Sequence, residues 1–224
     1  MTLRIVTFNI QHGRGPDGVV DHGRLANALA RLDADVLALQ EVDVRQRRSG
    51  GIDEAVLAAD ATGMGAVFGP ARRTGWQGRY GNALLARGHL ADVQVMAMPR
   101  PARGERRAAV LARVQMGDRA VSVAATHLAV EEDEARRQLA LLLEALGRRP
   151  RPHLLLGDLN LGPEHVGPAV EAAGMTMVGG PPTYPASGPR IRIDHVAVAG
   201  FDVASVFVPE SAVSDHRPLI VELG

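Results

Sequence analysis

Apolar positions along the chain repeat with two periods, one typical of strands and the other typical of helices. Short apolar runs predict strands at residues 3–10, 36–40, 66–68, 82–86, 92–98, 108–115, 120–126, 153–156, 193–199, 203–208 and 218–223. Apolar residues three or four positions apart predict helices at residues 23–32, 52–62, 131–146 and 164–173. Hairpins and crossovers between these elements indicate an α/β fold with two packed sheets flanked by helices.

No boundary between domains is visible in the sequence. The chain has 224 residues, which fits a single large α/β domain spanning residues 1–224. It contains no internal repeat, long linker or low-complexity segment. Gly, Pro or Arg residues are frequent at 46–51, 71–78 and 181–189, and we predict exposed loops there that either shape a site or connect elements.

Charge and composition narrow the classes of function. The 25 basic residues, all of them Arg, are balanced by 25 acidic residues, so the formal net charge is zero. Proteins that grip long nucleic acids carry a basic excess, and neutrality therefore argues against a high-affinity, non-specific DNA binder. The absence of cysteine excludes disulfides and thiolate zinc sites and fits the cytoplasm, where we expect the protein. We expect neither a signal peptide nor a membrane span, because no apolar run is long enough.

Polar side chains stand where several of the predicted strands begin or end. These residues are Asn9, Glu41, His127, Asp158, Asn160, Asp194, Asp215 and His216. Each one alone has an ordinary explanation as a turn former, a helix cap or a surface residue, but their accumulation at strand ends does not. Buried charges are costly unless they are paired, hydrated or bound to metal, and ligands of α/β proteins gather beside strand ends. Carboxylates with Asn and His suit a hard cation such as Mg²⁺ or Mn²⁺.

The order of these motifs resembles that of the endonuclease/exonuclease/phosphatase superfamily over essentially the whole chain. The matching segments are Thr7-Phe8-Asn9-Ile10, Leu39-Gln40-Glu41-Val42, Tyr80-Gly81-Asn82-Ala83-Leu84-Leu85, Thr126-His127-Leu128, Gly157-Asp158-Leu159-Asn160, Ile193-Asp194-His195-Val196 and Ser214-Asp215-His216-Arg217-Pro218. The resemblance implies a DNase I-like four-layer α/β sandwich, in which two packed mixed β-sheets are flanked by helices. It also implies metal-assisted attack of water on phosphorus.

The resemblance assigns the metal ion and the attacking water to four residues. Glu41 would be the principal ligand of Mg²⁺ or Mn²⁺, with Asn9 close by and Asp215 near the metal. Asp158 would position or deprotonate the attacking water. A divalent ion screens the charge of the phosphate and polarises the P–O bond, which agrees with these roles.

The resemblance assigns the phosphate itself to other residues. Asn160 would donate a hydrogen bond to the phosphoryl oxygens, and His216, oriented by Asp194, would contact the phosphate. His127 matches a position that acts as general acid or phosphate ligand in the DNase I-like branch. That branch orients the equivalent of His127 with a carboxylate, whereas the corresponding stretch here, Arg79-Tyr80-Gly81, has none. The partner of His127 is therefore open.

Candidates for substrate binding come from the same comparison and from a charge run. An Arg that meets the substrate phosphate in the family falls at Arg106 or Arg107, and the register between the two is open. Asn82 lies in a matching segment. Arg48 belongs to a charge run after Glu41, which is either a solvated face or a phosphate contact. The loop residues Trp76 and Tyr184 either line the rim of the site or pack ordinarily.

Together these observations predict a Mg²⁺-dependent hydrolase of phosphodiesters or phosphomonoesters. Short loops, neutral charge and few aromatic residues favour a small phosphorylated molecule or a lipid headgroup as substrate over long duplex DNA. The first alternative is a DNase I-like nuclease that acts on nucleic acid. The second is a catalytically silent binding module on the same scaffold. No obligate protein partner is evident.

Overall fold

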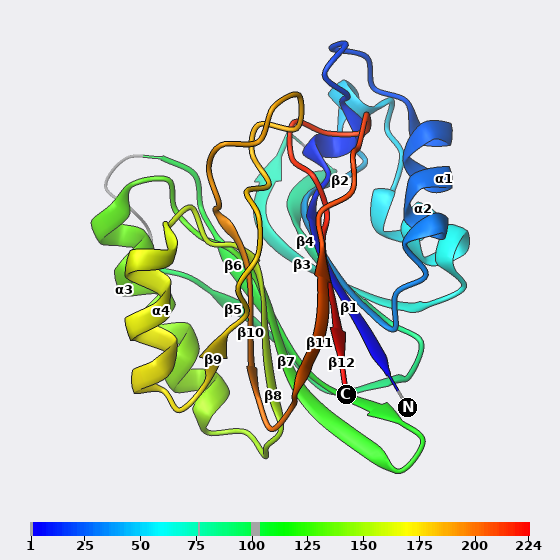
Figure 1. Ribbon diagram of the computed structural model, residues 1–224. Coiled ribbons are helices and arrows are strands. Elements are labelled where there is room, and N and C mark those ends of the chain that lie inside the picture. The colour runs from blue at the N-terminus through cyan, green and yellow to red at the C-terminus, as the bar shows by residue number, and fades with distance from the viewer. Residues whose placement is uncertain (1, 76, 100–103) are drawn as a thin grey trace.

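Two six-stranded β-sheets pack face to face in the computed structural model, which describes residues 2–75, 77–99 and 104–224 (Figure 1). The first sheet has the order β11 (Val203–Phe207), β12 (Leu219–Leu223), β1 (Leu3–Asn9), β2 (Val36–Val44), β4 (Gly78–Ala86) and β3 (Gly65–Thr74). The second has the order β5 (His89–Ala97), β6 (Ala108–Met116), β7 (Arg119–His127), β8 (His153–Asp158), β10 (Asp194–Ala199) and β9 (Thr176–Met177). Both sheets are mixed, because β1 and β2 run parallel, as do β7 and β8.

Helices cover the outer faces of the two sheets (Figure 1). The four α-helices are α1 (His22–Leu32) and α2 (Glu54–Thr62) on the first sheet, and α3 (Glu132–Gly147) and α4 (Pro163–Ala172) on the second. A core of aliphatic side chains lies between the sheets, and a further core lies under each helix pair. The predicted four-layer α/β sandwich is therefore confirmed. No helix in the described part of the chain is long and apolar enough to cross a membrane.

The helices begin and end where the sequence favours it. Asp21 precedes α1 and accepts a hydrogen bond from the backbone N–H of Arg24, which satisfies a donor that the first turn leaves free. Asp53 caps α2 in the same way. Gly63 ends α2 with φ of 67°, a left-handed conformation that glycine adopts without a steric penalty.

The first sheet departs from the sequence prediction along its edge. Segment 71–78, which we expected to be a loop, is mostly a hairpin, because β3 continues to Thr74 and β4 already begins at Gly78. That part of the prediction was wrong, because β3 is an edge strand whose partly exposed side chains show no apolar run. β2 also continues past Glu41 to Val44, through an irregularity between Leu39 and Val42. The short strand β9 was not predicted.

Parallel strands bring the site residues to one end of the sandwich. β1 and β2 end next to each other, with Asn9 beside Gln40. β7 and β8 also end together, with His127 beside Asp158. β10 runs antiparallel to β8, so its first residue, Asp194, lies beside Asp158. Because the two sheets are packed face to face, the polar ends of these five strands meet.

Candidate active site

Asp158 contacts polar side chains from both sheets. This carboxylate is 1% exposed, and its Oδ2 accepts a hydrogen bond from Asn9 Nδ2 at 3.0 Å. The same oxygen lies 3.3 Å from His127 Nε2 and 3.8 Å from His216 Nε2. Oδ1 accepts a hydrogen bond from the backbone N–H of Asn160 at 3.1 Å. Asp158 and four other predicted site residues are therefore held together by two hydrogen bonds and two close histidine–carboxylate contacts.

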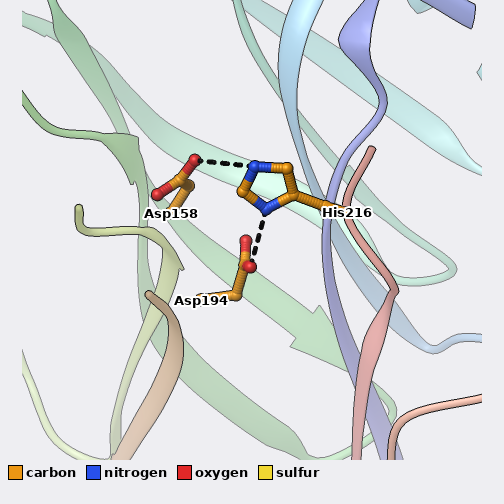
Figure 2. Close-up of side chains that lie close together, drawn as sticks. All are labelled: Asp158, Asp194 and His216. Atoms are coloured by element: carbon orange, nitrogen blue, oxygen red, sulfur yellow. Dashed lines mark hydrogen bonds and ion pairs between the residues drawn. The ribbon is translucent and has the colours of Figure 1, made fainter. Parts of the chain in front are cut away.

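His216 lies between two buried carboxylates (Figure 2). Its Nδ1 is 2.8 Å from Asp194 Oδ2, which also accepts a hydrogen bond from Thr183 Oγ1 at 2.5 Å. Its ring packs against Tyr184, with 4.9 Å between the ring centroids. Burial alone lowers the pKa of His216, but Asp194 and then Asp158 and Asp215 raise it to about 9. The imidazole therefore carries a proton at neutral pH.

The pKa of Asp158 is displaced in the opposite sense from that of a paired carboxylate. Burial raises this pKa, and the nearby charge of Asp194 raises it further, to about 7, although His216 and the hydrogen bond from Asn9 oppose the shift. A carboxylate with a pKa near neutrality can both accept and release a proton at the pH of a cell. Such a group is suited to general base chemistry.

Glu41 has the left-handed backbone conformation, with φ of 57°. It lies in the irregular stretch of β2 between Leu39 and Val42, where a bulge turns the side chain toward Asn9. Asn9 Nδ2 donates to Glu41 Oε1 at 3.2 Å, and this is the hydrogen bond that the carboxylate receives from the described residues. Burial raises the pKa of Glu41, and Asp215 adds to the effect. Asn9, Arg107 and His216 oppose this shift without cancelling it, so the negative charge of the carboxylate is only partly compensated.

Asp215 is held near Asn9 by two residues that the sequence did not single out. Gln11 Nε2 donates to Asp215 Oδ2 at 3.0 Å, while the backbone N–H of Gln11 donates to Asn9 Oδ1 at 3.1 Å. Ser214 Oγ donates to the carbonyl oxygen of Asn9 at 2.7 Å and lies 3.2 Å from Asp215 Oδ1. Gln11 has a positive φ of 43°, so a strained turn brings it back to the site.

Two groups of side chains have the chemistry of metal ligands. Within the described residues, Asp158, Asp194 and His216 offer ligand atoms that all lie within 4.8 Å of one another. His216 Nδ1 already faces Asp194 Oδ2, however, so this group is better described as a hydrogen-bonded triad. Glu41, whose charge is only partly compensated, and the nearby Asp215 provide the carboxylate oxygens that Mg²⁺ or Mn²⁺ prefers. The residues present thus fit a hard divalent cation.

Asn160 is fixed beside Asp158 by the backbone. Its φ is 50°, the second left-handed conformation among the predicted site residues after Glu41. Asn160 Nδ2 donates to the carbonyl oxygen of Leu128 at 3.0 Å, just after the end of β7. The amide nitrogen carries a second hydrogen, which leaves one donor for a further partner.

Arg106 and Arg107, between which the sequence did not decide, have different surroundings in the structure. Arg107 is 6% exposed, and its NH1 lies 3.3 Å from His127 Nδ1 and 3.5 Å from the hydroxyl of Tyr80. Arg106 instead lines a surface hollow of about 550 Å³ together with Arg72 and Arg73. Arg107 is thus the one that contacts the predicted site.

The other predicted substrate contacts are engaged within the protein. Arg48 forms an ion pair with the buried carboxylate of Asp43, with nitrogen–oxygen distances of 2.7 and 2.8 Å. Asn82 is 3% exposed and donates from Nδ2 to the carbonyl oxygen of Ala108 at 2.7 Å. Both side chains therefore have a structural partner, and substrate binding by either one stays a prediction. Trp76 lies outside the described residues.

The arrangement of strands and strand-end residues agrees with the comparison of the sequence with known families. A family model described as Endonuclease/Exonuclease/phosphatase family matches residues 6–216. The chain belongs to the endonuclease/exonuclease/phosphatase family. Membership of this family supports phosphoesterase activity, that is, the hydrolysis of phosphate esters. No curated protein matches the sequence significantly.

Several solved structures share the fold at low sequence identity. A family protein from Beutenbergia cavernae DSM 12333 is 24% identical, with a TM-score of 0.79 over 99% of this chain and 71% of that one. The mannosyl-6-phosphatase Bt3783 from Bacteroides thetaiotaomicron VPI-5482 is 16% identical, with a TM-score of 0.79 over 99% of each chain. The 2',3'-cyclic phosphatase ANGEL2 is 17% identical, with a TM-score of 0.74 over 100% of this chain and 95% of that one.

Proposed function

We propose that this protein hydrolyses phosphate esters with the help of Mg²⁺ or Mn²⁺. The observation that carries the proposal is the connected group around Asp158, in which a cationic His216 lies between two carboxylates and Asn9 links Asp158 to Glu41. Three groups with different roles are thereby adjacent. His216 offers a positive charge to the phosphate, Asp158 can accept a proton, and Glu41 can bind a cation. Family membership supports the same class of reaction.

The proposed roles follow from the contacts and charges of the side chains. Asp158, with a pKa of about 7, accepts a proton from the attacking water. His216, kept cationic by Asp194, binds a phosphoryl oxygen as negative charge develops on it. Asn160 offers its remaining amide hydrogen to another phosphoryl oxygen.

We assign the metal ion to Glu41, with Asn9 and Asp215 as its neighbours. When bound there, Mg²⁺ or Mn²⁺ screens the charge of the phosphate and polarises the P–O bond. The support for this assignment is the raised pKa of Glu41, which reflects burial of the carboxylate and the nearby charge of Asp215, opposed only in part by Asn9, Arg107 and His216. Binding a cation removes that imbalance.

We propose a small phosphorylated molecule or a lipid headgroup as the substrate. The formal net charge of zero and the small number of aromatic residues support a compact substrate over a long nucleic acid. The neighbour Bt3783 is a mannosyl-6-phosphatase, which is an enzyme of this kind. Nucleic acid remains the alternative, and the specific observation in its favour is the hollow lined by Arg72, Arg73 and Arg106, which suits a phosphodiester backbone.

A panel of substrates tests the proposal and separates the alternatives. Purified protein is assayed with Mg²⁺, with Mn²⁺ and with EDTA on bis-p-nitrophenyl phosphate, inositol phosphates, sphingomyelin and plasmid DNA. We expect metal-dependent cleavage of at least one small ester that His216→Ala abolishes. Cleavage of plasmid DNA alone would favour the nuclease, and inactivity on all substrates would favour the catalytically silent binding module.

A further inference from the structure

Both ring nitrogens of His127 face a neighbour whose hydrogen-bonding capacity is known. His127 is 4% exposed, and its Nδ1 lies 3.3 Å from NH1 of Arg107. Its Nε2 lies 3.3 Å from Oδ2 of Asp158. No carboxylate in the described part of the chain comes within 4.0 Å of Nδ1. The environment of this histidine is therefore cationic on one side and anionic on the other.

The chemistry of the two neighbours fixes where the proton of His127 resides. A guanidinium group donates hydrogen bonds and cannot accept them, so Nδ1 must be the unprotonated acceptor. The proton then resides on Nε2, from which it is donated toward Asp158. We propose that Arg107 is a positioning residue that holds His127 as the neutral Nε2–H tautomer. In the hydrolysis proposed above, on which this inference rests, His127 then donates a hydrogen bond and does not protonate the leaving group.

Arg107 is held firmly enough to impose this state. Its side chain is 5% exposed and its NH1 lies 3.3 Å from Glu105 Oε2 and 3.5 Å from the Tyr80 hydroxyl. The ring of Tyr80 lies between two further guanidinium groups, with Arg48 at 5.4 Å and Arg72 at 5.7 Å from its centroid. Arg107 therefore cannot turn away from His127 without losing contacts on several sides.

The hydrogen bonds of Asp158, which lies opposite Nε2, agree with the same tautomer of His127. Asp158 Oδ2 already accepts a hydrogen bond from Asn9, and Oδ1 accepts one from the backbone of Asn160. Both oxygens therefore act as acceptors, which matches a proton donated from Nε2 of His127. A second proton on Nδ1 would point at the cation of Arg107, and burial together with that cation keeps the pKa of His127 well below its usual range. A general acid would need surroundings that raise the pKa of His127.

The consequence concerns the leaving oxygen of the substrate. A neutral imidazole whose only proton is on Nε2, facing Asp158, retains that proton when the ester bond breaks. The leaving oxygen takes its proton from solvent water. Esters whose leaving groups depart without strong acid assistance are therefore the favoured substrates.

Nitrogen NMR of protein labelled with ¹⁵N-histidine tests the tautomer without any need for turnover. At neutral pH we expect the Nδ1 of His127 to give the signal of an unprotonated nitrogen and Nε2 that of a protonated one. A protonated Nδ1 in the unmodified protein would overturn the proposal, whether or not the enzyme is active. The signals are assigned by comparison with His127→Gln.

Variants of Arg107 test whether this residue is the cause. In Arg107→Met, we expect the pKa of His127 to rise relative to the unmodified protein, while burial still holds it below its usual range, so Nδ1 should take up a proton at a higher pH than in the unmodified protein. Arg107→Lys, which retains the charge and a donor, should restore the behaviour of the unmodified protein, and the matched control Arg106→Met should not change it. An identical nitrogen signature in Arg107→Met and the unmodified protein would show that Arg107 does not position His127.

A series of aryl phosphodiesters with graded leaving groups tests the chemical role. We expect His127→Gln to lower kcat by the same factor for every ester, because the amide of Gln replaces one hydrogen bond. A loss that grows as the leaving group becomes more basic would identify His127 as the acid and overturn the inference. Inactivity of the unmodified protein on every ester would instead contradict the proposed function, while the NMR result would still decide the tautomer.

Discussion

At the scale of single residues, the predicted site contains backbone conformations that are costly for the residues that adopt them. Glu41 and Asn160 both have positive φ values, of 57° and 50°. A non-glycine residue in this region is strained by on the order of 1 kcal/mol or more, and such strain persists only where the surroundings enforce it. At Glu41 the side chain faces Asn9, and at Asn160 the backbone N–H faces Asp158 while the side chain reaches the carbonyl oxygen of Leu128. Local stability is thus lower where the side chains must converge.

Removal of the Glu41 carboxylate should abolish the stabilisation of the protein by metal. A cation that binds only the native state raises the free energy of unfolding, by about 2.7 kcal/mol when its concentration is 100 times the Kd. We expect Mg²⁺ or Mn²⁺ to raise the melting temperature of the unmodified protein and not that of Glu41→Ala. The exposed Asp60 provides a control, since Asp60→Ala should keep the shift. An equal shift in both variants would mean that the cation binds elsewhere.

Asp194 and His216 should behave as one unit. We expect Asp194→Asn to fold and to lose roughly 10²- to 10⁴-fold in kcat/KM, a range typical of acid–base groups and their orienting partners. The double variant Asp194→Asn/His216→Ala should be scarcely worse than His216→Ala alone, because the second change removes nothing that still acts. Losses that multiply independently in this cycle would show that the two side chains are not coupled.

The pH dependence of the residual activity gives a second measure of the same pair. The cationic form of His216 is present below its pKa, which Asp194 raises to about 9, and it is lost as the pH rises through that value. Asp194→Asn removes the neighbouring charge and lowers this pKa. The alkaline limb of the pH–rate profile should therefore move to lower pH in the variant. A limb that stays in place would assign it to another group.

At the scale of the elements, the close approach of β7 and β8 depends on the absence of a side chain. A Cβ atom at Gly157 would lie 2.2 Å from the carbonyl oxygen of Thr126. Gly157 is the neighbour of Asp158 on β8, and Thr126 is the neighbour of His127 on β7. Any displacement of the two strands therefore changes the spacing between the carboxylate and the imidazole.

Gly157→Ala should consequently harm both stability and activity. The added methyl group forces the strands apart, and we expect a loss of about 1–3 kcal/mol in the free energy of unfolding, as for other overpacked positions. Chemical denaturation measures this loss. Gly147→Ala, at the end of α3 where a Cβ meets nothing within 4 Å, is the matched control and should be neutral or slightly stabilising. Equal stability of the two variants would contradict the steric argument.

Much of the fold was predictable because strands and helices with one buried face carry a regular apolar pattern. The helix face of Leu25, Leu29 and Leu32 is an example. The edge strand β3 was not predictable in full, since its partly exposed side chains lack such a pattern. The charge of Glu41 was interpreted as a strand end, whereas β2 continues through it. Apolar patterns report burial and not irregularities of the backbone.

The candidate site was also predictable only in part. Charged residues at the ends of apolar runs, such as Asp158 and Asp194, were visible in the sequence because buried charge is rare. Their supports were not visible: Thr183 and Gln11 had no signal of their own, and Tyr80 stood in a matching segment without an assigned role. They reach the site through turns and through packing between elements that are distant in the sequence. Side-chain contacts of that kind depend on the three-dimensional arrangement.

At the scale of the whole molecule, buried neutral histidines make the fold sensitive to acid. His195 on β10 is 1% exposed, and its Nε2 lies 2.8 Å from the carbonyl oxygen of Leu161, which can only accept a hydrogen bond. Burial lowers the pKa of His195 to about 4. The unfolded chain, with a pKa near 6.5, therefore binds the proton more tightly than the folded one.

Stability should accordingly fall between about pH 6.5 and pH 4. The contribution of His195 is fully present above the unfolded pKa of about 6.5 and is lost as the pH falls toward the folded pKa, by up to about 3 kcal/mol. His195→Gln keeps a donor for Leu161 and cannot titrate, so its free energy of unfolding should depend less on pH across this range. Urea denaturation at several pH values tests this difference, and parallel profiles would contradict it.

The position of β12 has a consequence for the synthesis of the protein. This strand lies between β11 and β1, so β1 lacks this neighbour until β12 has been synthesised. Asp215 and His216 directly precede β12 and are needed for the site. A nascent chain therefore has an open sheet edge at β1 and no assembled site. The site is complete only once β12 has been synthesised, and fragments that end before β12 leave the edge of β1 open to strand pairing with other chains.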